Sequence, residues 1–192
     1  MSTATLYNLA LFLHVVGALG IAAAYATDSI GLAGLRRSTT ADEARTWLLT
    51  RRWVLITGPA SILLVLVSGI YMMATQWGAV PWLIIAIGSL VAIAVAGGVL
   101  TGIPLGKLTP EIDHADGLLS PPVRRALRGR ALMLSITIRI GITTGIVFLM
   151  VVKPDWLGSI ATIGIATVCA IAAGLALAGR PGDSGVRNAA VH

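Results

Sequence analysis

The chain has 192 residues, of which 56% are hydrophobic and only 11% are charged, whereas a soluble domain carries about 25% charged residues. This composition excludes a soluble globular protein, because the surplus of apolar side chains requires contact with lipid. The single cysteine, Cys169, excludes a disulfide framework and cysteine-rich metal sites. The net charge of +6 does not indicate nucleic-acid binding, because Lys and Arg also set the orientation of membrane proteins. The expected partner is the lipid bilayer, and binding to nucleic acid is not expected.

Five apolar segments are each long enough to cross a bilayer of about 30 Å. They cover residues 6–26, 54–75, 82–103, 131–152 and 156–178. In lipid a helix satisfies its own backbone polar groups. The sequence therefore predicts an all-α fold, a polytopic bundle of five transmembrane helices that forms one domain over residues 1–178. Residues 179–192 are rich in Gly, Pro, Asp, Ser and Arg and are predicted to be a disordered cytoplasmic tail.

Positive residues gather on one side of these segments. Twelve of the fourteen Lys and Arg lie between the first and second segments, between the third and fourth, or in the tail. The positive-inside rule then predicts that the N-terminus lies outside and the C-terminus in the cytoplasm. We expect the membrane to be the inner membrane of a bacterial cell. We expect the first segment to be retained rather than cleaved as a signal peptide, because residues 1–5 carry no positive charge.

A helix start is encoded between the first two segments. Thr40 is followed three residues later by Glu43, the spacing of a capping box. The helix that begins there carries Trp47, which is expected at the membrane surface. The same helix is expected to run on into the second apolar segment.

His14 lies inside the first apolar segment, about 12 Å from the outer edge. One interpretation makes its neutral imidazole a ligand of a metal or haem, or a member of a proton relay. The other makes it a structural histidine that is bonded to Ser or Thr on a neighbouring helix. Both stay open, because an intramembrane histidine is uncommon and supports either role.

Arg139 is the single charged residue within the five segments, about 12 Å from the inner edge. It either binds an anionic group, such as a haem propionate, a quinone oxygen or a substrate carboxylate, or forms a structural pair with Asp28. Asp28 lies fourteen residues after His14, which is about four helical turns, so both project from one face of the first helix. The sequence thus predicts Asp28 and Arg139 as an intramembrane polar pair.

The second segment carries a polar stripe formed by Thr57, Ser61, Ser68 and Tyr71. Their spacings of 4, 7 and 3 residues place them on one helical face. We expect this face to point into the bundle, where hydroxyl groups form hydrogen bonds between helices more often than they form a binding site.

Small residues recur in the third and fourth segments, at Gly97, Gly98 and Gly102 and at Gly141 and Gly145. Such spacings favour close packing of membrane helices. They predict contacts between helices of the bundle. A homo-oligomer or a larger membrane complex is also expected to form through these small-residue faces.

The segment LALFLHVVGA at residues 9–18 and the segment SGIY at residues 68–71 resemble a family of small bacterial integral membrane proteins of unknown function. The first segment is also similar, more distantly, to membrane proteins of the HemJ and copper-resistance CopD type. The HemJ resemblance implies that His14 serves haem. It further implies that a polar or basic residue in a later helix, here Arg139, takes part.

Two functions follow as hypotheses. In the first, His14 ligates a single b-type haem or a related redox cofactor, and Arg139 anchors the anionic edge of that cofactor. No metal site for His14 other than haem is predicted. In the second, no cofactor binds, and the protein is a non-enzymatic membrane subunit or small-solute pathway in which His14, Asp28 and Arg139 are internal polar packing residues. The sequence contains no motif of a soluble enzyme, and catalytic residues are not predicted.

Overall fold

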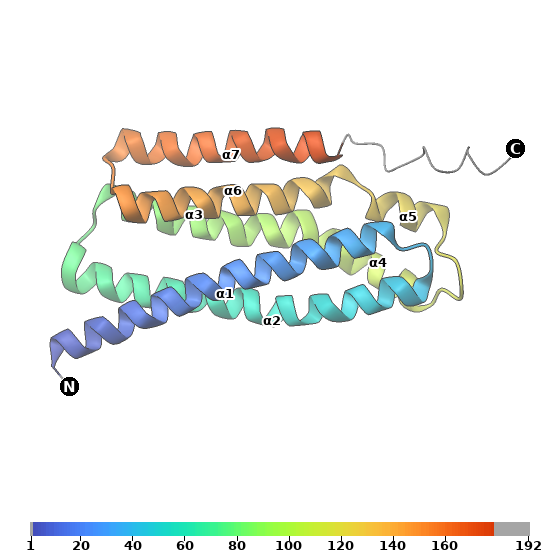
Figure 1. The fold of residues 1–192 in the computed structure, drawn as a ribbon, viewed down its shortest axis with the longest axis horizontal. Coiled ribbons are helices and arrows are strands. Elements are labelled where there is room, and N and C mark those ends of the chain that lie inside the picture. Colours follow the sequence, from blue (N-terminus) through green and yellow to red (C-terminus); the bar gives the residue numbers. More distant parts are fainter. Residues whose placement is uncertain (1, 179–192) are drawn as a thin grey trace, which may run out of the picture.

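The computed structural model describes residues 2–178, and this part of the chain is helical with no strand (Figure 1). The predicted all-α class is confirmed, as are five helices long and apolar enough to span a membrane. The predicted tail, residues 179–192, lies outside the described residues. The elements are α1 (Thr3–Arg37), α2 (Ala41–Met72), η1 (Met73–Trp77), α3 (Pro81–Gly97), η2 (Gly98–Gly102), α4 (Ile103–Asp113), α5 (Pro121–Leu127), α6 (Arg130–Val152) and α7 (Trp156–Ala178).

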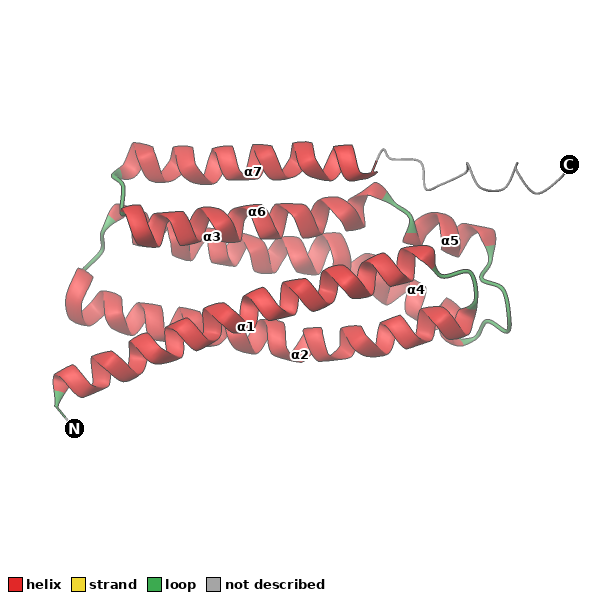
Figure 2. Cartoon of the chain, viewed as in Figure 1, coloured by secondary structure: helices red, strands yellow, loops and turns green. Residues whose placement is uncertain are grey.

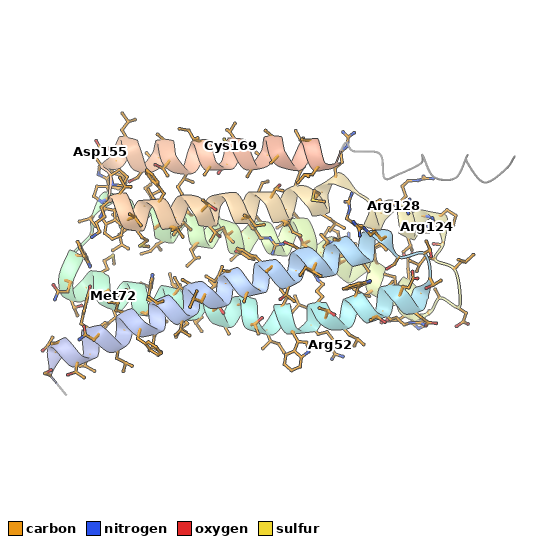
Figure 3. All side chains as sticks on the ribbon, viewed as in Figure 1. Arg52, Met72, Arg124, Arg128, Asp155 and Cys169 are labelled. Carbon is orange, nitrogen blue, oxygen red and sulfur yellow. The ribbon has the colours of Figure 1, made fainter. Side chains whose placement is uncertain are left out.

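The long helices lie side by side and identify a multi-pass membrane protein. Helices α1 and α2 form one antiparallel hairpin, and α6 and α7 form another, with α3 packed against α6. The connection between α4 and α5 and the turn between α1 and α2 meet at one end of the bundle, as the green loops of Figure 2 show. We call this the charged end, because Arg124 and Arg128 lie there, whereas Asp155 lies at the opposite end (Figure 3).

Three helices extend well beyond the apolar segments that predicted them. The 35 residues of α1 measure about 52 Å, against about 30 Å of hydrocarbon. The continuous helical stretches Ala41–Trp77 and Pro81–Asp113 are similarly long. The helices therefore continue past the segment limits predicted at residues 26, 54 and 103. The expectation that the helix beginning after Thr40 runs on into the second segment is confirmed, because α2 is continuous from Ala41 to Met72.

That region has a hydrophobic core of its own. Eleven buried residues from α1, α2, α4, α5, α6 and the loops form it: Leu32, Leu35, Ala41, Ala44, Leu105, Ile112, Leu119, Val123, Leu127, Leu132 and Ile136. Side chains tie the loops to the helices: Arg36 Nη1 donates to the Gly129 carbonyl at 2.9 Å, and Arg45 Nη2 donates to the Ala115 carbonyl at 2.7 Å. The charged end is thus a compact cap in which the helix ends are fixed relative to one another.

The predicted capping box at the start of α2 is confirmed. The backbone N–H of Glu43 donates to the Thr40 hydroxyl, and the Glu43 carboxylate accepts from the backbone N–H groups of Thr39 and Thr40. These hydrogen bonds, that from Thr39 first, lower the pKa of Glu43 below its ordinary value, because they favour its charged form. The Trp47 ring is half-buried and packs against α1, where Gly34 leaves room for it, and its place at the membrane surface stays a prediction.

Glycines set the close approach of both hairpins. A Cβ at Gly17 of α1 would meet Val65 at 2.8 Å, and one at Gly141 of α6 would meet the Ala166 carbonyl of α7 at 2.9 Å. A Cβ at Gly145 would likewise meet Ile163 of α7 at 3.0 Å. The Gly141 and Gly145 face predicted from the sequence is therefore occupied by α7 of the same chain.

At the end of the bundle opposite the charged end, two tryptophan rings pack against each other. The rings of Trp77 and Trp82 meet edge to face at 5.8 Å, and Lys153 Nζ lies 4.0 Å from the centre of the Trp77 ring. Aromatic side chains of this kind are enriched where membrane helices leave the lipid core, so this end marks the second membrane boundary.

Candidate functional site

Asp28 forms ion pairs with two arginines from two different helices. Its Oδ1 accepts from Arg51 Nη1 of α2 at 3.0 Å, and its Oδ2 accepts from Arg139 Nη2 of α6 at 2.7 Å. The side chains are 3%, 12% and 10% exposed, respectively. The structure thus brings the predicted pair of Asp28 and Arg139 together and adds Arg51 as a third member. We call these three residues the Arg–Asp–Arg cluster.

The cluster is held from the side of α6 and η2. Arg139 Nε donates to the Ser135 carbonyl at 3.2 Å, and the hydroxyl of Thr101 donates to the buried Ser135 hydroxyl at 2.6 Å. The Arg139 guanidinium also lies over the Tyr25 ring, 5.3 Å from its centre, a distance at which a cation is attracted to the aromatic face. Contacts from α1 and from α6 itself therefore fix the orientation of Arg139, and η2 supports them through Ser135.

The formal charge of the cluster is +1, because one carboxylate faces two guanidinium groups. No second carboxylate among residues 2–178 forms an ion pair with Arg51 or Arg139. Arg139 Nη1 and the remaining Arg51 nitrogens form no hydrogen bond with other described residues. Both guanidinium groups are paired with Asp28, and their nitrogens that have no partner remain available as donors to an anion.

The free side of the cluster faces a cavity of about 450 Å³ between α2 and the α3–η2 stretch, with walls that are largely apolar. On α2 its lining runs from Arg51 to Leu66, which is about 22 Å along the helix axis. On the other wall Gly97, Gly98 and Gly102 leave the space open, and a Cβ at Gly98 would meet no atom within 4 Å. Gly97 keeps part of the predicted close contact, because a Cβ there would meet Arg139 Cδ of α6 at 3.5 Å, whereas Gly98 only lines the cavity.

A second cavity of about 510 Å³ continues the first toward the charged end. The two cavities share Arg51, Leu55 and Gly102 in their linings. The second adds Arg45, Arg52 and Asp113 among other residues. Most of the remaining lining is apolar, as in the first cavity. Arg51 therefore lines both cavities. We call the first the apolar cavity and the second the polar cavity, the latter only because Arg45, Arg52 and Asp113 are added to its lining.

Two members of the cluster, Asp28 and Arg51, lie near the depth expected for lipid head groups, and Arg139 starts about 12 Å farther in along α6. Asp28 follows the first apolar segment by two residues, and Arg51 precedes the second by three. Trp53, next along α2, is 71% exposed and is of the type that marks the membrane boundary. The apolar cavity thus extends from head-group depth toward the middle of the membrane.

His14 lies elsewhere and is already hydrogen bonded. Its Nδ1 is 3.1 Å from the Val65 carbonyl and 3.2 Å from the Ser68 hydroxyl, both on α2. Because a carbonyl only accepts, the first contact requires a proton on Nδ1. The arrangement is the one that the structural interpretation of His14 described.

A haem shared by His14 and Arg139 does not fit these residues. The cavity beside His14 holds about 30 Å³, room for one water molecule, whereas small-molecule sites measure about 300 to 1,000 Å³. Arg139 lines the other cavity and binds Asp28, which lies about 21 Å from His14 along α1. No group of three or more His, Cys, Asp and Glu suited to a metal ion occurs within residues 2–178.

The predicted polar stripe divides between two environments. Ser68 is buried against His14, and a Cβ at Gly20 would contact the Ser61 side chain, so both serines face α1. Tyr71 is half-buried. Thr57 is exposed, contrary to the expectation of an inward face, because its hydroxyl donates to the Trp53 carbonyl at 2.8 Å and is satisfied within its own helix.

Arg51 is the site residue that the sequence analysis missed, and a pairing rule would have found it. The turn between α1 and α2 is centred near residue 39. In an antiparallel hairpin, residues equally far from the turn lie opposite each other, so the numbers of two facing residues add up to about 79. His14 with Val65 obeys this sum, and so does Asp28 with Arg51. The positively charged loop was interpreted only as a signal of orientation, although two of its arginines lie within reach of the membrane.

Comparison of the chain with protein-family models, with curated proteins and with solved structures finds no match.

Proposed function

We propose that this membrane protein binds an anionic amphiphile, with its head group on the Arg–Asp–Arg cluster and its chain in the apolar cavity. The observation that carries the proposal is the unbalanced positive charge at the mouth of that cavity. Guanidinium groups present several donors in one plane and suit phosphate and carboxylate oxygens. The cavity has the size and the apolar lining typical of small-molecule sites.

The depth of the site supports the same ligand class. An amphiphile already placed in the bilayer has its anionic head at the level of the cluster and its chain at the level of the cavity. Entry between α2 and α3 requires no passage of the charged group through hydrocarbon, which would be costly. We therefore infer lateral entry from the membrane.

We further propose that the charged end faces the cytoplasm of a bacterial cell, with the N-terminus outside and the protein in the inner membrane. Ten of the Lys and Arg residues in the described part of the chain lie at the charged end or beside the cluster, and only Lys153 lies at the opposite end. The positive-inside rule supports this orientation. Under it, the ligand comes from the cytoplasmic leaflet.

This proposal makes the protein a binding protein or pathway component and assigns it no catalytic step. The cofactor predicted from the resemblance, haem b on His14, stays a prediction without support from the local geometry. Assembly of several copies through small-residue faces also stays a prediction, and the face formed by Gly141 and Gly145 already contacts α7.

A pair of glycine substitutions tests the binding proposal. Gly98→Leu places a side chain in the apolar cavity, and a Cβ there meets no atom within 4 Å, so the fold is expected to survive. Gly88→Leu is the matched control, because Gly88 lies on α3, the helix that leads into η2, is also free of contacts within 4 Å and lines neither cavity. The unfolding temperature of each variant in dodecyl maltoside is measured with increasing dodecyl phosphate or with zwitterionic dodecylphosphocholine.

Dodecyl phosphate is expected to stabilise the parent protein and the Gly88→Leu variant, because a ligand that binds only the folded state raises its stability. Gly98→Leu should lose this stabilisation, and dodecylphosphocholine should give little in any variant. Equal stabilisation by both amphiphiles, or full stabilisation of Gly98→Leu, would show that the apolar cavity is not an anion-selective site.

A further inference from the structure

The polar cavity offers space that a ligand with a single anionic group would leave empty. It continues the apolar cavity beyond the cluster and shares Arg51 with it. Its volume of about 510 Å³ exceeds what one phosphate requires. A head group held by Arg51 and Arg139 therefore has space ahead of it, on the side away from the membrane interior.

The charge of the combined site exceeds that of the cluster. Arginines outnumber aspartates in the linings of the two cavities: the arginines are Arg45, Arg51, Arg52 and Arg139, and the aspartates are Asp28 and Asp113. The linings together carry a formal charge of +2. Arg45 is also paired with Asp42, at 2.7 Å, and that carboxylate is 89% exposed. Arg52 and Asp113 are exposed as well, so water screens these charges, and the positive excess rests mainly on Arg51 and Arg139.

The polar cavity is also shaped by fixed groups rather than by a mobile loop. Arg45 Nη2 donates to the carbonyls of Asp113 and Ala115 at 2.9 and 2.7 Å, which ties α2 to the end of α4. Gly102 and Gly106 lie on the facing wall, and a Cβ at Gly106 would meet no atom within 4 Å. The second chamber is thus held open between two helices that are joined at its outer end.

We propose that the head group of the ligand carries two phosphoryl groups in line, one on the Arg–Asp–Arg cluster and the second in the polar cavity. The inference rests on the proposed function and narrows its ligand class to long-chain diphosphates and diphosphate esters. The chain fills the apolar cavity, the first phosphoryl group bridges Arg51 and Arg139, and the second meets the positive lining of the polar cavity. The two shared residues Leu55 and Gly102 form the passage through which the head group extends.

The test compares ligands that differ by one phosphoryl group. Apparent Kd values for farnesyl monophosphate, farnesyl diphosphate and inorganic diphosphate are obtained from the concentration dependence of the unfolding temperature in non-ionic detergent. The proteins are the parent chain, Gly106→Leu, which fills the polar cavity, and the control Gly88→Leu, which lines neither cavity.

The parent chain is expected to bind farnesyl diphosphate about tenfold more tightly than the monophosphate, as one additional charge-assisted contact allows. Gly106→Leu should abolish this difference and leave the affinity for the monophosphate unchanged, and Gly88→Leu should behave as the parent. Inorganic diphosphate should bind much more weakly than either, because it lacks the chain.

Three outcomes overturn the inference. Equal Kd values for the monophosphate and the diphosphate in the parent chain would limit the head group to one anionic group and leave the proposed function standing. A preference for diphosphate that persists in Gly106→Leu would place the second phosphoryl group outside the polar cavity. No binding of either farnesyl compound would overturn both this inference and the proposed function.

Discussion

Asp28 shares its carboxylate between Arg51 and Arg139, one oxygen to each, at 3.0 and 2.7 Å. The three residues are therefore not equivalent. Loss of Asp28 leaves two positive charges facing each other with no counter-ion, whereas loss of either arginine leaves a neutral pair. Stability and ligand binding should consequently respond to different members of the cluster.

Asp28→Asn is expected to be the most destabilising change in the cluster, by about 3 to 5 kcal/mol, because it leaves buried charge uncompensated. Arg51→Gln removes one hydrogen bond to a charged group and should cost about 1.5 to 3 kcal/mol. The free energies of unfolding of the two variants in detergent give the comparison. A larger loss in Arg51→Gln would mean that Asp28 is not the shared partner.

A double-mutant cycle tests the pair of Asp28 and Arg139 directly. Because the partners contact each other, the effects of Asp28→Asn and Arg139→Gln should not add, and the double variant should lose less than the sum of the two single variants. Strict additivity, with both single variants folded, would show that Arg139 is stabilised by another group.

Gly34→Ala should weaken the α1–α2 hairpin, because a Cβ at that position overlaps the Trp47 ring. Overpacking of this kind costs about 1 to 3 kcal/mol. Gly88→Ala is the control, since a Cβ there meets no atom within 4 Å. Thermal unfolding should separate the two variants, and the addition of Trp47→Leu to Gly34→Ala should recover part of the loss. Identical behaviour of the two alanine variants would contradict the close contact.

Haem binding through His14 is tested by the absorbance spectrum of the purified protein after addition of haemin. The small space beside His14 predicts no ligated haem in the parent chain. The hydrogen bond from His14 Nδ1 to the Val65 carbonyl does not oppose ligation, because it leaves Nε2 unprotonated. A high-spin or mixed haem spectrum that disappears in His14→Ala would contradict this expectation and restore the haem hypothesis, since a single imidazole is the expected ligand.

The orientation of the chain is tested by a reporter fused after Ala178. The positive-inside rule predicts that this point lies in the cytoplasm, so a fluorescent protein fused there should fluoresce and a periplasm-active enzyme should not function. The reverse result would place the charged end outside the cell and would remove the cytoplasmic leaflet as the source of the ligand.

The sequence predicted the helical class and all five spans, because long uncharged segments leave a chain in lipid no other structure. It also predicted the capping box at Thr40 and Glu43, since that signal is local. It did not show how far α1 and the α3–α4 stretch extend, because those helices continue into a packed region with its own core, which apolar length does not reveal.

The site was predicted only in part. The pairing of Asp28 with Arg139 follows from depth, since few partners are available to a charge inside a bilayer. The role of Arg51 and the two cavities depends on how α2 stands against α3. That arrangement is set by contacts between segments far apart in the chain, and it is not encoded in any one periodicity.

The central claim is that the net positive charge of the Arg–Asp–Arg cluster binds an anionic amphiphile. Arg51→Gln lowers the formal charge of the cluster from +1 to zero and retains the pair of Asp28 and Arg139. The control is Arg37→Gln, because Arg37 is exposed at the end of α1 and lines neither cavity.

The most direct measurement is the rise in unfolding temperature that dodecyl phosphate causes in these two variants and in the parent chain. We predict a similar rise in the parent and in Arg37→Gln, and the loss of most of that rise in Arg51→Gln. An equal rise in all three proteins would contradict the account, because Arg51 would then contribute nothing to binding of the anion.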